Sequence, residues 1–407
     1  MKNQAATFTA EPRRNMGALK APGRCVVCTS NGLDVVLDLG QQPLANGLLH
    51  SLTDPAPTLP LRLASCSGCG HVQLVDFASP EAMFSDYVFR TGASEPAKEH
   101  FGALACKLVA AKPPGWICEV GSNDGTLLKA LSELGEKPVG VDPSSVAQGV
   151  EYTVRRYFGR ETARDLLYRL GEAGAVVMCN VLAHAPDPYD LLEGAALLTA
   201  YEGLLVIEAP YLFDLLAAGA WDTIYHEHFS YYSAAVLHRM LASSGFIVER
   251  VERLPHVHGG SLRVWARRTL DVQRSPRCRE WAELLRTEGS PDWDGFQGRV
   301  DAHAAALRDA CGGKRFAAYG AAAKATVLLN YTGLQPSFIV DTTPDKWWRY
   351  IPGVGTPIVP VSSLGPYDPD KILVTAWNYA EHILAQHPEY AGRWIVPFGP
   401  HRTVEFH

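Results

Sequence analysis

Four of the nine cysteines stand in two close pairs near the N-terminus. Cys25 and Cys28 form the first pair, and Cys66 and Cys69 form the second. A two-residue gap lets both thiolates of one turn reach the same ion, and Zn²⁺ prefers four soft ligands at tetrahedral corners. The spacing therefore predicts a zinc ribbon or knuckle pair. A closed set of four thiolates predicts a structural ion, because catalytic zinc keeps an open coordination position.

A second group of reactive side chains lies in the segment 225–232, which reads YHEHFSYY. Its two histidines stand two residues apart, whereas those of a zinc-protease helix stand four apart around the metal. Histidine, with an ordinary pKa of about 6.5, can take a proton at neutral pH, and a neighbouring carboxylate or phenol can orient it. The segment predicts a general base, the alternative being buried histidines that only satisfy structural hydrogen bonds.

A glycine turn at 119–125 (EVGSNDG) follows an apolar run and opens a helical stretch. Gly121 there lets the backbone approach a ligand at the helix N-terminus, and Asp142, about 20 residues on, is suited to two ribose hydroxyls. Only one of the three glycine positions of the dinucleotide-binding motif is clearly matched. The pattern therefore favours S-adenosylmethionine, which has no pyrophosphate, over NAD. Asn180 follows a later strand and can line the same pocket.

Two further motifs carry a cation beside glycines. The segment 258–263 (HGGSLR) ends at Arg263, which can pair with a phosphate or carboxylate, although turn formation alone also explains its glycines. In 319–324 (YGAAAK), Lys324 opens a helix and can meet a phosphate, and Asp341 follows about 20 residues on. This unit resembles half of a nucleotide site; close helix–strand packing with a solvated lysine is the alternative.

The elements that must position these groups alternate between strand and helix from about residue 96. Runs typical of strands lie at 116–120, 138–142, 175–179, 203–208, 245–249, 261–266, 314–319, 338–341, 371–375 and 394–398, with helical stretches at 126–131 and 276–310. Such alternation indicates βαβ units and parallel sheets. We predict an α/β protein with a zinc-binding domain over 1–95, a doubly wound domain over 96–275 and a second α/β domain over 276–407.

Composition excludes several classes of protein. Lys and Arg number 37 against 43 Asp and Glu, a net charge of −6 that lacks the basic footprint of a nucleic-acid-binding protein. No stretch approaches the about 18 uncharged apolar residues of a membrane span, and the first 20 residues lack the apolar core of a secretory signal. An odd cysteine count without an export signal argues against a disulfide framework. We expect a cytoplasmic protein without nucleic-acid or membrane partners.

Taken together, these motifs resemble the nucleotide-sugar C-methyltransferases. The likeness also includes 42–46 (QPLAN) and 180–187 (NVLAHAPD), and it runs in the same order over about residues 24–400. The resemblance implies S-adenosylmethionine-dependent enzymes of deoxysugar and antibiotic biosynthesis. It also implies a zinc-binding N-terminal domain, a central class I Rossmann-like methyltransferase domain and a C-terminal Rossmann-like domain that helps bind the nucleotide sugar.

The resemblance implies methylation of C3 of a TDP-4-keto-deoxysugar. The C4 ketone acidifies the C3 proton, so one base and some stabilisation of the enolate oxygen generate a carbon nucleophile. By resemblance His228 is the base, with Glu227 and Tyr225 holding substrate or orienting the imidazole. Positioning then accounts for most of the catalysis of methyl transfer.

The same resemblance distributes the remaining site residues. It assigns the methyl donor to Glu119, Gly121, Asn123, Asp124, Asp142 and Asn180. It assigns the substrate to Tyr87, Arg90, His184, His226, Arg263 and Lys324.

One motif departs from the family pattern. The family usually shows Tyr-x-Tyr followed by small hydroxyl residues, whereas 87–92 reads YVFRTG. Phe89 removes a phenol that can contact the sugar or enolate, and Arg90 adds a charge nearby. A changed sugar substituent, another nucleotide, or a nitrogen or oxygen acceptor would each fit this change.

Two other classes of function stay open. A nicotinamide-dependent sugar oxidoreductase would use the unit from Gly320 to Asp341 as its cofactor site. A non-catalytic protein would bind sugar nucleotides without turning them over. The chain is expected to be a monomer or a small homo-oligomer.

Overall fold

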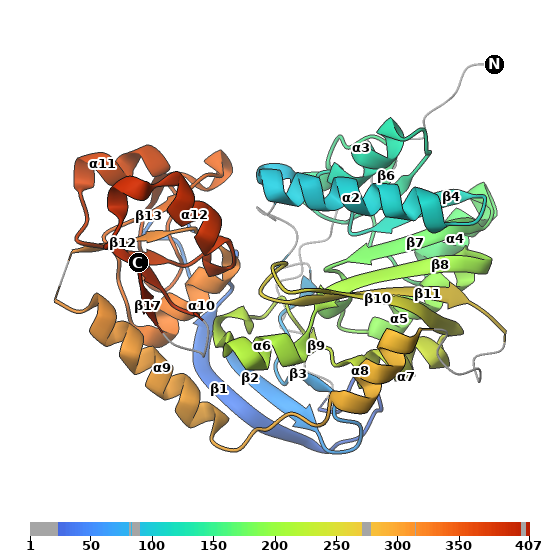
Figure 1. The fold of residues 1–407 in the computed structure, drawn as a ribbon, viewed down its shortest axis with the longest axis horizontal. Coiled ribbons are helices and arrows are strands. Elements are labelled where there is room, and N and C mark those ends of the chain that lie inside the picture. The colour runs from blue at the N-terminus through green and yellow to red at the C-terminus, as the bar shows by residue number, and fades with distance from the viewer. Residues whose placement is uncertain (1–22, 81–82, 84–89, 271–277, 314, 400–403) are drawn as a thin grey trace.

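The chain builds three β-sheets flanked by helices (Figure 1). The structure is a computed structural model that describes residues 23–80, 83, 90–270, 278–313, 315–399 and 404–407. In the view of Figure 1 the C-terminal sheet lies on the left and the central sheet on the right, with the N-terminal strands below and between them. None of the helices in the described ranges is long and apolar enough to cross a bilayer.

The central sheet is doubly wound, as predicted. In sheet order its seven strands are β10 (Phe246–Leu254), β11 (Ser261–Arg268), β8 (Thr199–Pro210), β7 (Ala173–Cys179), β4 (Trp116–Val120), β5 (Val139–Val141) and β6 (Thr153–Val154). The strands from β8 to β6 run parallel, and β11 is antiparallel to both β8 and β10. Strand order reverses between β4 and β7, and such a switch point opens a crevice at the carboxyl ends.

Helices cover both faces of the central sheet. One face carries α2 (Glu95–Ala111) and α3 (Thr126–Glu133); the other carries α4 (Arg160–Leu170), α5 (Pro188–Leu198), α7 (Ala234–Ser243) and α8 (Arg279–Thr287). Because helices cover both faces of β7, its residues 175–178 are fully buried and form a continuous apolar run. The short α6 (Leu212–Ala218) follows β8.

The C-terminal sheet repeats this plan on a smaller scale. Its order is β14 (Ile358–Pro360), β13 (Ile339–Asp341), β12 (Phe316–Tyr319), β15 (Lys371–Val374), β16 (Trp394–Val396) and β17 (Glu405–Phe406). Its helices are α9 (Phe296–Cys311), α10 (Ala323–Thr332), α11 (Leu364–Tyr367) and α12 (Ala380–Gln386). The order reverses between β12 and β15, so a second switch point lies at their carboxyl ends.

The N-terminal sheet connects the other two. It contains β1 (Leu33–Pro43), β2 (Thr58–Cys66) and β3 (Val72–Leu74), to which the central chain adds β9 (Ser230–Tyr231). These strands were not anticipated from the sequence. Leu37, Leu61 and Phe229 belong to the same apolar cluster as Val300 of α9 and Val327 of α10. The N-terminal and C-terminal sheets therefore share one core.

A buried hydrogen bond links these two parts. The Thr326 hydroxyl of α10 donates to the Ala45 carbonyl at 2.8 Å. Thr326→Val should lower the free energy of unfolding by about 1–3 kcal/mol, because a buried carbonyl loses its donor. Chemical denaturation followed by circular dichroism measures this.

Thr199→Val is the matched control. The buried Thr199 hydroxyl donates to the Ala195 carbonyl of the preceding helix at 2.7 Å, and the Thr199 N–H donates to the same carbonyl, so that carbonyl keeps a partner when the hydroxyl is removed. Equal losses in both variants would contradict a stabilising link between the two sheets.

Candidate functional site

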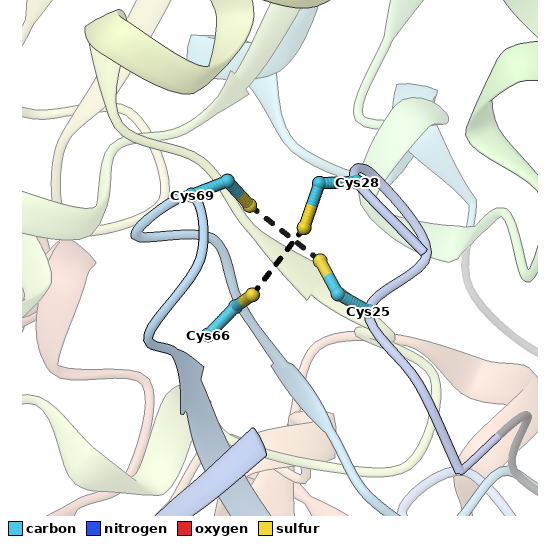
Figure 2. Close-up of side chains that lie close together, drawn as sticks. All are labelled: Cys25, Cys28, Cys66 and Cys69. Atoms are coloured by element: carbon cyan, nitrogen blue, oxygen red, sulfur yellow. Dashed lines mark hydrogen bonds between the residues drawn. The ribbon is translucent and has the colours of Figure 1, made fainter. Parts of the chain in front are cut away.

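The four predicted metal ligands come together (Figure 2). Cys25 and Cys28 lie on the loop before β1, Cys66 ends β2, and Cys69 lies in the turn to β3. All four sulfur atoms lie within 4.8 Å of one another, with Cys25 Sγ 3.6 Å from Cys69 Sγ and Cys28 Sγ 3.5 Å from Cys66 Sγ. Four thiols at this spacing fit one tetrahedral Zn²⁺, and a set of four protein ligands fits a structural ion.

The glycine turn after β4 has a backbone that only glycine accommodates. Gly121 has a φ of 70°, and a Cβ there would lie 2.4 Å from Val181 Cγ2 just beyond β7. Asn123 and Asn180 also take positive φ, 50° and 55°, which asparagine tolerates better than most residues. The turn therefore brings the ends of β4 and β7 into contact at the switch point.

Asp142 lies at the same edge, directly after β5. Its Oδ2 accepts the Asn123 N–H at 2.8 Å, and its Oδ1 accepts the Ser144 N–H at 2.8 Å. Oδ1 also accepts the Ser144 hydroxyl at 2.5 Å, so these three donors fix the carboxylate at the crevice. Within the described part of the chain Oδ2 has one donor and a second lone pair, so Asp142 can still accept a hydroxyl donor there.

The crevice has buried acceptor atoms that fit the methyl donor. Glu119 Oε2, Ser122 Oγ and Asn180 Oδ1 have no hydrogen-bond partner among the described residues. Burial, with help from the Asp142 and Asp124 carboxylates, raises the pKa of Glu119 well above its usual value. S-adenosylmethionine carries two positive charges and ribose hydroxyl donors, which complement these acid-rich surroundings.

Two residues assigned to the methyl donor also hold the chain that crosses the glycine turn. Asn123 Oδ1 accepts the Thr91 N–H, and Asp124 Oδ2 accepts the Gly92 N–H, both at 2.9 Å. Asp124 Oδ1 accepts the Thr126 hydroxyl at 2.7 Å. Their side chains thus shape the crevice by fixing 91–92 against it.

The predicted base has a defined proton position. His228 Nδ1 lies 3.1 Å from the Thr223 carbonyl, which can only accept, so Nδ1 carries the proton. Nε2 then accepts the Tyr225 hydroxyl at 2.8 Å. Burial, together with nearby His184 and His258, keeps the pKa of His228 well below its usual value. The imidazole is therefore neutral at neutral pH, the form that accepts a proton.

His184 joins the crevice to this base. It ends a short 3₁₀ turn, η3 (Leu182–His184), that follows Asn180, and its ring meets that of His228 edge-on with centroids 4.8 Å apart. Burial lowers the pKa of His184 to about 4. His184 thus connects residues predicted to bind the donor with the predicted base.

Glu227 points to a different partner from its neighbour His228. Both of its carboxylate oxygens accept from Asn46 Nδ2, at 2.8 and 2.9 Å. Only 2% of Glu227 is exposed, and burial raises its pKa to about 7. Glu227 therefore ties the segment 225–228 to the motif 42–46, and Tyr225 and Thr223 orient the imidazole.

Two residues assigned to substrate are held by other groups. His226 is fully buried and its Nε2 donates to the Pro60 carbonyl at 3.2 Å. Arg263 forms a buried ion pair with Glu208 at 2.6 Å, and His100 Nε2 lies 2.9 Å from the same carboxylate. The structure does not place either side chain beside His228.

Lys324 lies in the first turn of α10, nearly buried. Its Nζ is 4.1 Å from the centre of the Trp377 ring and donates to Asn378 Oδ1. Burial lowers the pKa of Lys324, while the Asp222 carboxylate opposes that shift. Its cluster with Trp377 and Asp222 was not anticipated, although Trp377 lies just beyond β15 at a switch point, a position where ligand-site residues gather.

The motif 87–92, which departs from the family pattern, lies partly outside the described residues: Tyr87 and Phe89 are not described. Arg90 Nε donates to Asp345 Oδ2 of the C-terminal domain at 2.9 Å, and both side chains are about half exposed. The added charge is therefore balanced by an interdomain ion pair.

The second nucleotide-like unit repeats the hydrogen bonds of the first. Asp341 accepts the Ala321 N–H at 2.7 Å and the Thr343 N–H at 2.8 Å. Here, however, Lys346 Nζ donates to the Ala321 carbonyl at 2.9 Å and lies 3.4 Å from Asp341 Oδ2. Lys346 thus already donates to the carboxylate that a cofactor ribose would need, which argues against the nicotinamide-dependent alternative.

Comparisons with known proteins agree with this geometry. Three family profiles match the chain: a zinc-binding domain over 25–84, a methyltransferase domain over 99–251 and the C-methyltransferase C-terminal domain over 256–399. C-methyltransferase NovU of Streptomyces niveus is 31% identical over 405 residues, covering 93% of this chain and 96% of the relative.

Solved structures of methyltransferases match part of the chain at low similarity. Magnesium protoporphyrin IX methyltransferase from Synechocystis, with bound S-adenosylmethionine, is 17% identical over 42% of this chain and 79% of its own, with a TM-score of 0.31. A methyltransferase from Archaeoglobus fulgidus is 18% identical over 42% and 94%, with a TM-score of 0.34.

Removing zinc should destabilise the chain, because a structural zinc site contributes directly to folding. We expect about one zinc ion per chain by elemental analysis. Chelation or Cys66→Ser should lower the melting temperature by several degrees or more. Cys106→Ser, at an exposed cysteine of α2, is the control and should retain zinc. An unchanged melting temperature after complete chelation would contradict a structural role.

The buried Glu227 carboxyl should make stability depend on pH. Its pKa rises from 4.5 to about 7 on folding, so it destabilises the fold when ionised. The penalty is absent below pH 4.5 and complete above pH 7. Glu227→Gln should therefore be more stable than wild type at pH 8, by up to about 3 kcal/mol, with the gain shrinking toward pH 5.

Denaturant titrations at several pH values measure this gain. Glu133→Gln, at an exposed position of α3, provides the comparison and should change stability little at any pH. A gain for Glu227→Gln that does not depend on pH would contradict the ionisation argument.

Proposed function

Because the chain belongs to the C-methyltransferase family and uses S-adenosylmethionine, we propose that its acceptor is C3 of a TDP-4-keto-deoxysugar. The observation that carries this proposal is the neutral His228 imidazole, whose Nδ1 proton is held by the Thr223 carbonyl. A carbon acceptor needs a base for its C–H proton, and His228 Nε2 is a proton-accepting atom in a buried site next to the methyl-donor crevice.

Tyr225 and His228 would act in sequence on the sugar. When the Tyr225 hydroxyl donates its hydrogen bond to the C4 carbonyl oxygen, it no longer donates to His228 Nε2, which becomes free to accept a proton. Nε2 then takes the C3 proton. The C–H electron pair forms the C3–C4 double bond, and the carbonyl π pair moves to the oxygen, where the Tyr225 donor stabilises the enolate. Burial makes the His228 imidazolium acidic, so it readily gives the proton up afterwards.

The residues around the glycine turn would position the methyl donor. S-adenosylmethionine supplies an electrophilic methyl group on sulfur, which the enolate carbon takes as the carbon–sulfur bond breaks. Asp142 would accept the ribose hydroxyls, and Glu119 with Asn180 would accept the donor's remaining N–H and O–H groups. The glycine at 121 keeps the turn compact enough for close approach.

Mass spectrometry tests the proposal. Purified zinc-containing protein is incubated with trideuteromethyl S-adenosylmethionine and a panel of TDP- and GDP-linked 4-keto-deoxysugars. A product carrying the label on C3 supports the proposed acceptor and identifies the sugar. Label on nitrogen or oxygen would contradict the enolate route, and no product from any panel member would contradict the substrate class.

The base assignment predicts the behaviour of His228→Asn. Methyl transfer should fall about 10²- to 10⁴-fold, the usual contribution of a positioned general base. Donor affinity, measured by titration calorimetry with S-adenosylhomocysteine, should stay within about twofold of wild type, because the crevice is unchanged.

His238→Asn is the matched control. This histidine of α7 accepts from Trp281 Nε1 at 3.3 Å, and activity should survive its replacement. Wild-type turnover in His228→Asn would remove His228 from the mechanism.

A further inference from the structure

The indole of Trp377 is a meeting point for three separate segments of the chain. Trp377 follows β15 in the C-terminal domain and is 8% exposed. Its N–H edge, its ring face and its outer edge each contact a different segment. Two of those segments belong to the motifs singled out above, and the third lies directly before the base.

The N–H edge holds the turn before His228. Trp377 Nε1 donates to Asp222 Oδ2 at 2.9 Å, and Asp222 is fully buried. Asp222 lies in the 3₁₀ turn η4 (Trp221–Thr223), whose last carbonyl accepts the His228 Nδ1 proton. Asp222, to which Trp377 donates, directly precedes Thr223, whose carbonyl determines which nitrogen of His228 carries the proton.

The ring face and outer edge hold two other motifs. Lys324 Nζ lies 4.1 Å from the ring centre, within the range of a cation–π contact. Gly259 of the HGGSLR turn packs so closely that a Cβ there would lie 2.5 Å from Trp377 Cη2. The indole therefore touches Lys324 of the C-terminal domain with its face, and Gly259 and Asp222 with two of its edges.

The neighbouring Trp221 strengthens the same link. Its Nε1 donates to His303 Nδ1 of α9 at 3.0 Å, and its ring meets Phe398 and Tyr331 edge-on. Two adjacent residues of η4 are thus bonded to the C-terminal domain, which leaves little freedom for the Thr223 carbonyl that follows.

We propose that Trp377 is a positioning residue for methyl transfer, which fixes the Asp222–Thr223 turn and so holds His228 in its Nδ1-protonated orientation. The C-terminal domain then sets the geometry of the base as well as helping to bind substrate. The catalytic part of this inference rests on the proposed function of His228, whereas the structural part does not.

Trp377→Phe tests the proposal. Phenylalanine retains a ring face for Lys324 but removes the donor to Asp222, leaving a buried carboxylate oxygen without its partner. In ¹⁵N-histidine NMR, with the His228 signal assigned by its loss in His228→Asn, we expect the Nδ1-protonated tautomer to shift or broaden. Solvent-deuterium exchange at the acceptor carbon should fall at least tenfold, with KM for the donor unchanged.

Trp281→Phe is the matched control. Trp281 is fully buried and also donates one hydrogen bond, to His238, but it belongs to a different apolar cluster from Trp377. It should lose stability without moving the His228 signal. A second pair tests the same bond from its other side: Asp222→Asn keeps an acceptor oxygen and should preserve the tautomer, whereas Asp222→Leu should disturb it.

An unchanged His228 signal in both Trp377→Phe and Asp222→Leu would overturn the proposal, as would an equal disturbance in Trp281→Phe. Absence of exchange or methylation in the wild type would instead count against the proposed function. The NMR comparison would then still decide whether Trp377 positions His228.

Discussion

The hydrogen bond from His228 to the Thr223 carbonyl is the interaction that the rest of the site depends on. It places the proton on Nδ1 and leaves Nε2 as the acceptor. The bond is local in sequence, yet the segment that makes it is held from three sides. Asn46 binds Glu227 from the N-terminal domain, Trp377 binds Asp222 from the C-terminal domain, and β9 continues the segment into the N-terminal sheet.

Holding this segment has an electrostatic cost. Glu227 and Asp222 are carboxyl groups in surroundings that raise their pKa, and burial pushes the pKa of Lys324 and His228 down. Buried ionisable groups of this kind gather at functional sites because a reaction needs their protonation states, not because they stabilise a fold.

The two α/β units share one backbone arrangement at the switch point but differ in which groups donate to its buried acceptors. In both, an aspartate after the second strand accepts two backbone N–H groups at the switch point. In the central unit, Glu119 Oε2, Ser122 Oγ and Asn180 Oδ1 have no hydrogen-bond partner within the described part of the chain. In the C-terminal unit Lys346 supplies the donor itself. Lys346 therefore marks a chemical difference between the two switch points.

Spacing and periodicity along the sequence predicted the four-cysteine cluster, the glycine turn and most strands of both α/β units, but not the short strands β6, β14 and β17. The predicted features depend on contacts or backbone limits within a few neighbouring residues, so spacing and periodicity record them. Only the tertiary structure decided that Glu227 bonds to Asn46, 181 positions away, that the N-terminal sheet shares a core with α10, and that Trp377 reaches Asp222. Such pairings follow from how whole elements pack, and no local pattern specifies which distant side chain will lie opposite.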